Sequence, residues 1–169
     1  MPIGETGFGG TYVVAGSNAP SISPINRSRF VRDSTLVIRT LLSGNITDPE
    51  NANRASNEQF MMVEWMDRPA RYPVITIEQV GFESNRIGMQ SDNSIANVNF
   101  ELNVWSKSTA QTDSLAGSIF AVLDQNGYTL SRDGLHNGRF LGMQNLDEPG
   151  PAGVHRKRIE IAYTWLSET

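Results

Sequence analysis

The sequence contains no cysteine, which excludes disulfide frameworks, thiol nucleophiles and cysteine-ligated metal sites. It also lacks any apolar run near the ~18 residues that a membrane-spanning helix requires. The N-terminus has no basic flank followed by an apolar stretch, so it does not resemble a secretory signal. We therefore expect neither a membrane span nor a secretory leader in this chain.

Charge is also in short supply. Charged residues make up 19% of the 169 positions, below the ~25% of an average soluble domain. The net charge of −4 argues against a general nucleic-acid-binding surface, which needs clustered Lys and Arg. Gly, Pro, Ser and Asn together account for 53 residues. The length predicts one domain, and the composition predicts long loops around a modest core.

Residues 1–26 are the part of the sequence least like a folded core. They are rich first in Gly and then in Ser, Pro and Asn. One interpretation is a flexible N-terminal tail. The other is an arm that becomes ordered on a partner, with Phe8, Tyr12 and Ile22 as apolar anchors. We expect the remaining residues, 27–169, to form a single domain.

Two stretches have the apolar spacing of amphipathic helices. Residues 28–43 form the first, with Ser28 as its N-cap and Gly44 at its left-handed end. The second helix begins at Ser108, which makes a capping-box pattern with Gln111.

Strands are predicted where β-branched and aromatic residues gather or where apolar and polar residues alternate. Four such segments are residues 72–82, 95–105, 139–146 and 154–165, and a short strand near 59–66 interrupts the long 45–71 segment. Because strands that are neighbours in sequence form hairpins, we expect an α+β fold. Its antiparallel β-sheet has two α-helices packed on one face, in the order α-β-β-α-β-β. The polar connection 83–93 is long, so this hairpin should project from the body.

The segment 95–105 alternates most strictly, which indicates one buried face and one open face. The open face carries a polar ladder that ends in an aromatic residue: Asn97, Asn99, Glu101, Asn103 and Trp105. This ladder faces either water or another subunit, since amide side chains suit wet protein interfaces. Trp105 as an exposed aromatic, and Trp65 outside the predicted core, add spare apolar surface, which is typical of proteins that assemble.

A basic run opens the last predicted strand and contains Arg156, Lys157 and Arg158. One interpretation is the solvated start of a strand. The other is a contact for an acidic partner surface or for phosphate. Because the whole chain is acidic, we favour a protein interface over DNA.

No group of residues points to catalysis. His136 lies in a turn-rich stretch and His155 opens the basic run, and neither has a carboxylate or second His at metal-ligand spacing. The chain has no G-x-S-x-G elbow, and its Gly cluster at residues 4–10 lacks the Lys-Ser/Thr pair of a phosphate loop. We expect no enzyme activity, and no catalytic, metal-binding or cofactor-binding residues.

The order of several segments is nevertheless distinctive. They are the helix FVRDSTLVIRTLLSG, the strand entry YPVITIEQVG, the strand NVNFELNVWS, the helix TAQTDSLAGSIFAVLDQNGY and the closing strand RKRIEIAYTW. In this order they resemble the tail terminator, or tail-completion, proteins of tailed phages. The resemblance runs from about Arg29 to Leu166, and it does not include the N-terminal extension or the 45–71 segment.

The resemblance implies a structural virion protein with an α+β fold. Such proteins form hexameric rings that cap the tail tube at its head-proximal end, stop its polymerisation and join it to the head connector. The implied partners are further copies of the chain, the tail tube protein and the connector or neck protein. DNA would pass through the lumen without specific binding, and assembly would take place in the host cytoplasm. We expect the interfaces to lie in the 83–93 loop, the 45–66 segment and the N-terminal arm.

Two other functions remain open. One is another part of the virion, namely a head–tail connector, neck or tail tube protein. The other is a small α+β enzyme or ligand-binding domain that uses both histidines.

Overall fold

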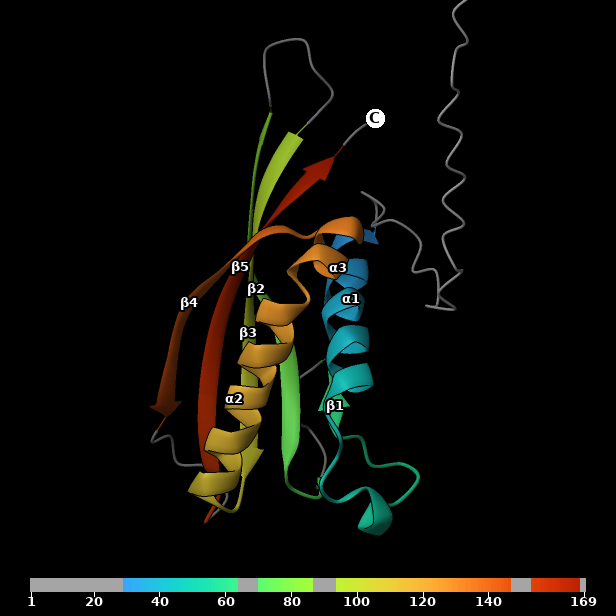
Figure 1. Cartoon of the computed structure of the whole chain (residues 1–169), viewed down its shortest axis with the longest axis vertical. Coiled ribbons are helices and arrows are strands. Elements are labelled where there is room, and N and C mark those ends of the chain that lie inside the picture. The colour runs from blue at the N-terminus through green and yellow to red at the C-terminus, as the bar shows by residue number, and fades with distance from the viewer. Residues whose placement is uncertain (1–28, 64–69, 87–93, 147–152, 168–169) are drawn as a thin grey trace, which may run out of the picture.

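The computed structural model describes residues 29–63, 70–86, 94–146 and 153–167 (Figure 1). The predicted arm at 1–26, with its anchors Phe8 and Tyr12, lies outside these residues, as do the proposed cap Ser28 and Trp65.

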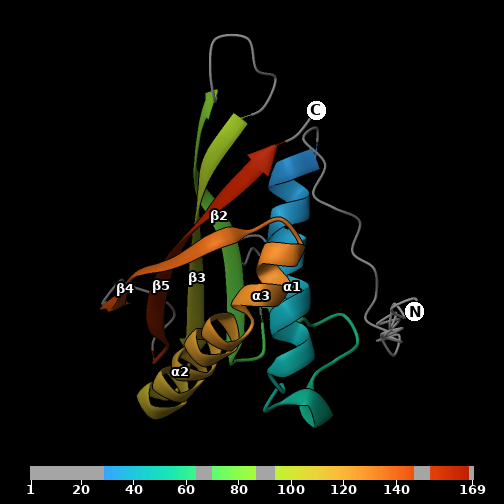
Figure 2. The ribbon, with the colours of Figure 1, turned by 45° about the horizontal axis from the view of Figure 1, so that its top comes forward.

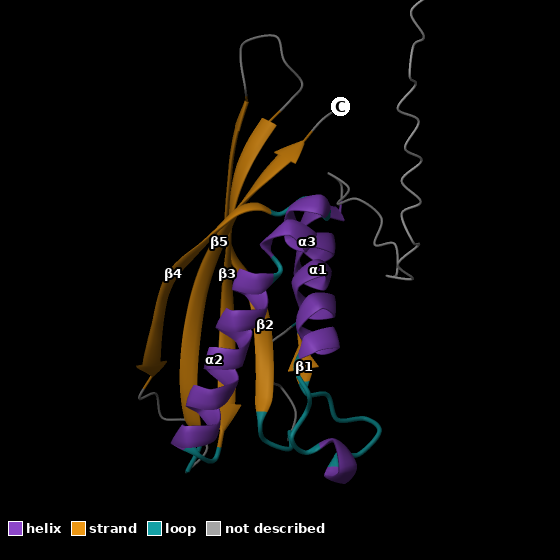
Figure 3. Ribbon diagram, in the orientation of Figure 1, coloured by secondary structure: helices purple, strands orange, loops and turns teal. Residues whose placement is uncertain are grey.

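The described chain folds into two layers, a twisted β-sheet and a layer of helices on one of its faces (Figures 1 and 2). The elements are α1 (Phe30–Asn45), the 3₁₀ turn η2 (Asn51–Asn53), β1 (Met61–Met62), β2 (Val74–Arg86), β3 (Ser94–Ser106), α2 (Thr109–Gln125), α3 (Gly127–Arg132), β4 (His136–Leu146) and β5 (His155–Ser167). The five strands lie in the order β1-β2-β3-β5-β4 (Figure 3).

The α+β class, with helices on one face of the sheet, is as expected, but two details of the prediction are wrong. The sheet is mixed, because Met61 and Met62 of β1 pair in parallel with Ile75 and Thr76 of β2. A third helix, α3, follows α2 after a single residue because the chain turns there to bury Leu130 in the core. The observed order is therefore α-β-β-β-α-α-β-β.

Helix α1 forms because its apolar residues fall on one stripe. Phe30, Val37, Ile38 and Leu42 are buried against the sheet, whereas Val31 faces out with 62% of its surface exposed. Gly44 does not end the helix in a left-handed conformation as predicted, because the chain leaves α1 at Ile46 with extended backbone. Burial of the Ile46 side chain in the core fixes this exit.

Helix α2 begins after Ser108, as predicted, but the capping box does not form. The Ser108 side chain makes no cap hydrogen bond. The Oε1 atom of Gln111 instead accepts a hydrogen bond from the Ser106 hydroxyl at the end of β3. Leu115, Ile119 and Leu123 face the sheet and are buried, in agreement with the predicted stripe.

The central strands β3 and β5 pair over their whole length, from Ser94 opposite Ser167 to Ser106 opposite His155. Strand β3 also pairs with β2 as far as Arg86, so residues 83–86, predicted as loop, belong to the strand. This long hairpin extends past the helical layer (Figure 1). Its tip, residues 87–93, lies outside the described residues.

The hydrophobic core lies between the helices and the inward-facing side chains of β2, β3 and β5. Its largest fully buried members include Phe100, Ile38, Ile77, Ile119 and Ile159. Strand β4 differs from the others because most of its side chains are exposed. It lies at the edge of the sheet and pairs only with β5 among the described strands.

Candidate interaction surface

The face of the sheet opposite the helices carries most of the predicted site residues. The register between β3 and β5 places Trp105 opposite Arg156 and Asn103 opposite Arg158. The polar ladder and the basic run are thus neighbours on one surface, which we call the outer face, although Asn103 and Arg156 are 53 residues apart in the sequence.

Arg156 is the centre of this surface. Its Nη2 atom lies 3.0 Å from Oε1 of Glu101, and its Nε donates to Oδ1 of Asn103 at 2.9 Å. Its Cζ atom lies 4.8 Å from the centroid of the Trp105 ring. The Arg156 and Glu101 side chains are only 10% and 14% exposed, so this charged cluster is largely removed from water.

Trp105 is not the exposed aromatic that the sequence predicted, because only 5% of its surface is accessible. Arg156 lies over its ring, and its Nε1 atom is 3.5 Å from the Thr76 hydroxyl on β2. Alternation alone assigned Trp105 to the outer face correctly. Its burial depends on β2 and β5, which the pattern of β3 does not reveal.

The side chains of the polar ladder become less exposed along β3, from Asn97 to Asn103. Asn97 is exposed, Asn99 and Glu101 are half-buried, and Asn103 is fully buried. The prediction of one open face is therefore right near Asn97 and wrong near Asn103 and Trp105. Hydrogen bonding among Asn103, Glu101 and Arg156 satisfies the buried polar groups there.

The remaining basic side chains of the run also have acidic partners within the chain. Lys157 points to the helical side and pairs with Asp113 of α2. Arg158 lies 3.6 Å from Glu101 and 3.2 Å from Glu160. An acidic partner would have to compete with these pairs, and a role of the run in binding one stays a prediction.

Glu78 adds an acidic group that the sequence analysis did not single out. It lies on β2 opposite Glu101, and its Oε1 atom is buried without a hydrogen-bond partner among the described residues. Burial and the nearby Glu101 charge raise the pKa of Glu78 above its usual value, against the opposing effect of Arg156. The outer face therefore holds an incompletely compensated carboxylate next to the end of β1.

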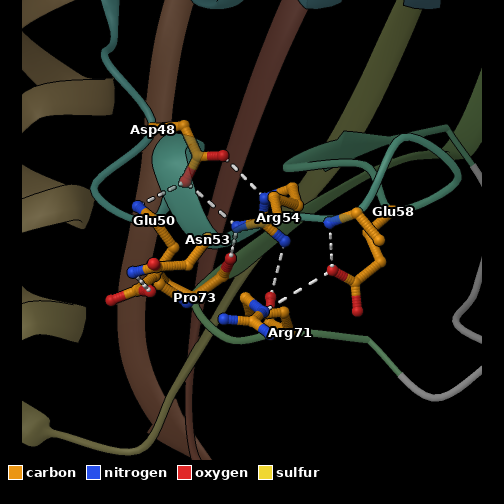
Figure 4. Close-up of polar contacts among 8 residues, drawn as sticks. Asp48, Glu50, Asn53, Arg54, Glu58, Arg71 and Pro73 are labelled. Atoms are coloured by element: carbon orange, nitrogen blue, oxygen red, sulfur yellow. Dashed lines mark hydrogen bonds and ion pairs between the residues drawn. The ribbon is translucent and has the colours of Figure 1, made fainter.

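Arg54 anchors the long connection between α1 and β1 (Figure 4). Its Nε atom lies 2.6 Å from Oδ2 of Asp48, and its Nη2 donates to Oδ1 at 3.0 Å. It also donates to the backbone carbonyls of Arg71 and Pro73, at 2.6 and 2.8 Å, just before β2. Arg54 thus fastens the segment 45–57 to the entry of the sheet.

The electrostatics of Asp48 reflect this anchor. Burial alone would raise the pKa of its carboxyl group. The hydrogen bonds from Arg54 and the Glu50 amide, together with the guanidinium charge, outweigh burial and lower the pKa below its usual value. Asp48 is therefore held ionised.

An open cleft of about 580 Å³ lies between the C-terminal half of α1 and the anchored segment. Arg39 and Gln59 lie on its wall, 3.4 Å apart at their closest polar atoms. Arg39 is partly exposed and Gln59 is exposed, so they do not form a desolvated, convergent site of the kind that enzymes use.

The two histidines do not meet. His136 lies opposite Thr164, whereas His155 lies at the other end of β5, nine residues away. At ~3.3 Å per strand residue, this separates their backbones by roughly 30 Å. The His136 Nδ1 atom contacts the Ser131 hydroxyl at 2.7 Å. In the described part of the chain, no three His, Cys, Asp or Glu side chains form a metal-binding group.

The sequence did not reveal the roles of Glu78 and Arg54, and it predicted β4 as a strand without showing that the strand is an exposed edge. A signal existed for Arg54, because it is the only basic residue between Asn45 and Asn57 and follows Asp48 by six residues. No signal in β2 alone could show that Glu78 would lie beside Glu101, because that proximity depends on the strand register.

None of the helices in the described residues is long and apolar enough to span a membrane. A comparison with curated proteins found no match. A comparison with protein-family models matched residues 38–167 to the family described as tail completion protein gp17. This match covers every strand of the sheet and the C-terminal half of α1. The match agrees with the resemblance noted above. The chain therefore belongs to the tail completion protein gp17 family and is a structural protein of a phage tail.

Proposed function

We propose that the chain is a tail terminator that forms a closed ring, most simply of six copies, on the head-proximal end of the tail tube. The ring stops tube polymerisation and presents a surface to the head connector. The observation that carries this proposal is the family match, which includes every strand of the sheet together with α2 and α3.

The geometry supports a role in assembly rather than in chemistry. In the polar cluster around Glu101, the charged side chains form ion pairs with one another, Arg156 and Arg158 both lying near Glu101. The features that extend from the core are the long β2–β3 hairpin and the exposed strand β4. Extended strands at the margins of a domain can reach neighbouring subunits. The net charge of −4 suits a lumen through which DNA slides without binding.

Interrupting the gene in its phage tests the proposal. A terminator predicts that tails grow past their normal length and fail to join heads, as seen in electron micrographs. Expression of the intact chain in trans should restore tails of normal length. Normal tails joined to heads without the chain would contradict the proposal.

The main alternative is a tail tube or neck protein. A tube protein predicts that the purified chain polymerises into long stacks, and that phage lacking it makes no tubes at all. A neck protein predicts tails of normal length that remain separate from heads. These three outcomes are distinct, so one set of micrographs separates the candidates.

A further inference from the structure

The sheet has two open edges in the described part of the chain. No described strand pairs with β4 along one of its sides, from His136 to Leu146. On the opposite side of the sheet, β1 pairs only with Ile75 and Thr76, so among the described residues β2 is open from Ile77 to Arg86. Unpaired strand edges offer free N–H and C=O groups and readily accept another strand.

Strand β4 pairs irregularly with β5 at two points, but it has little of the charge that usually protects an edge. It contains no Lys and no Pro, and Arg139 is its only Lys, Arg, Asp or Glu residue. Phe140, Leu141 and Met143 expose 44%, 52% and 38% of their surfaces. Natural proteins usually cover such an edge or place charges on it. A second strand along β4 would bury these side chains.

The two open edges match in direction. Each neighbouring pair from β2 through β3 and β5 to β4 is antiparallel, so β4 runs opposite to β2. A second copy placed beside the first in the same orientation would therefore set its β2 antiparallel to β4. Such contacts are head-to-tail, and they form a ring when the rotation between copies closes.

The side chains on the helical side of both edges are also compatible. Phe140 packs on Phe120 of α2, with ring centroids 5.1 Å apart. On the other edge, Phe82 packs on Phe30 of α1, also at 5.1 Å, and half of its surface is exposed. Aromatic side chains in directly opposed positions stabilise a strand pair.

On the outer face of the sheet, the two edges carry opposite charges. Arg139 lies opposite Ala162 on the outer face and makes no ion pair with any described residue. Strand β2 carries Glu83 opposite Asn97 on the same face, and Glu78 further along. If Phe140 lies opposite Phe82, the antiparallel register places Arg139 opposite Glu83. The same register aligns Asn145 with Ile77, so nearly all of β4 lies along the open part of β2.

We propose that β4 of one copy pairs antiparallel with the open part of β2 in the next copy, with Arg139 facing Glu83 and Phe140 facing Phe82. The sheet is then continuous between subunits around the ring. This inference rests on the proposed function, because it names the contact that closes that ring.

Charge exchange in the full-length chain tests the pairing. Arg139→Glu and Glu83→Arg each place like charges opposite one another and should weaken ring formation about tenfold or more, measured by sedimentation. The double variant Glu83→Arg/Arg139→Glu restores opposite charges and should recover the ring. Lys107→Glu, an exposed charge reversal outside both edges, is the matched control and should leave the ring unchanged.

Cross-linking tests the register independently. The chain has no native cysteine, so Phe82→Cys and Phe140→Cys provide the only thiols. Under mild oxidation, a mixture of the two single variants should give covalent dimers, and a chain with both substitutions should give a ladder of covalent oligomers. Circular dichroism of each variant verifies that it is folded.

The outcomes separate this inference from the proposed function. A ring that resists both charge reversals and forms no Phe82–Phe140 cross-link overturns the strand pairing and leaves the terminator role intact. A strictly monomeric chain that is also absent from purified tails overturns both. Recovery by the double variant, together with the cross-link, supports the pairing against docking of another segment on β4.

Discussion

The Arg156 guanidinium lies over the Trp105 ring on the outer face of the sheet, with 4.8 Å between its Cζ atom and the ring centroid. The same guanidinium donates to Glu101 and Asn103. One side chain of β5 thus satisfies the buried polar groups of β3 and covers its only tryptophan. The stability of the outer face should depend on it.

Arg156→Ala should lower the free energy of unfolding by about 2–4 kcal/mol, because it removes the buried guanidinium that pairs with Glu101 and donates to Asn103. Chemical denaturation measures the change. Arg156→Lys should recover only part of it, since an ammonium group cannot make the forked hydrogen bonds. Arg132→Ala is the control, because its pair with Asp133 is more exposed, and it should cost less than about 0.5 kcal/mol. Equal losses in the two alanine variants would contradict the central role of Arg156.

Asp48→Asn should lower stability by about 1–3 kcal/mol at neutral pH, since it removes the charged acceptor of Arg54. The pKa of Asp48 is lowered in the folded protein from its usual 3.8. Its contribution is therefore present above pH 3.8 and is lost as the pH falls through the folded value. Unfolding free energies measured between pH 7 and pH 3 should show a smaller acid loss in the variant. A parallel pair of curves would contradict this assignment.

Glu78→Gln should stabilise the fold at neutral pH, by less than about 1 kcal/mol because the carboxylate is partly screened by water. The folded pKa of Glu78 is raised above its usual 4.5, so ionisation opposes folding. The favourable contribution is complete below pH 4.5 and is lost as the pH rises through the raised value. Thermal melts at pH 4 and pH 7 should show the gain only at the higher pH. A lower melting temperature at pH 7 would instead mean that the carboxylate has a stabilising partner.

Two glycine substitutions should have opposite effects. A Cβ atom at Gly138 would lie 2.7 Å from Cε1 of Tyr163, so Gly138→Ala should destabilise the chain by about 1–3 kcal/mol through overpacking. Gly117 lies on the exposed side of α2 with open space around it. Gly117→Ala should stabilise by about 0.5–1 kcal/mol. Denaturant midpoints measure both changes, and a shift in the same direction would refute the packing at Gly138.

The spacing of apolar residues was sufficient to predict the elements in which that spacing is regular. The residues from Ala96 to Val104 alternate strictly, and the structure buries those apolar side chains as expected. The stripe of α1 was predicted for the same reason. The end of α1 was not, because the burial of Ile46 decides it and a helix-ending glycine pattern gives no information about the core.

The candidate site shows where such reasoning stops. Sequence pattern identified both the polar ladder and the basic run, yet it treated them as separate surfaces. Trp105 and Arg156 meet only because β3 pairs with β5 in one register. Glu78 meets Glu101 through a second register, between β2 and β3. Both registers are set by the whole sheet, so neither strand alone predicts the contacts or the burial that follows.

The most direct test of the terminator assignment is the position of the chain in purified tails. A C-terminal affinity tag labelled with gold particles would mark each copy in electron micrographs. A terminator predicts label at one end of each tail only, at the head-proximal end. Label distributed along the tube, or tails without label, would contradict it.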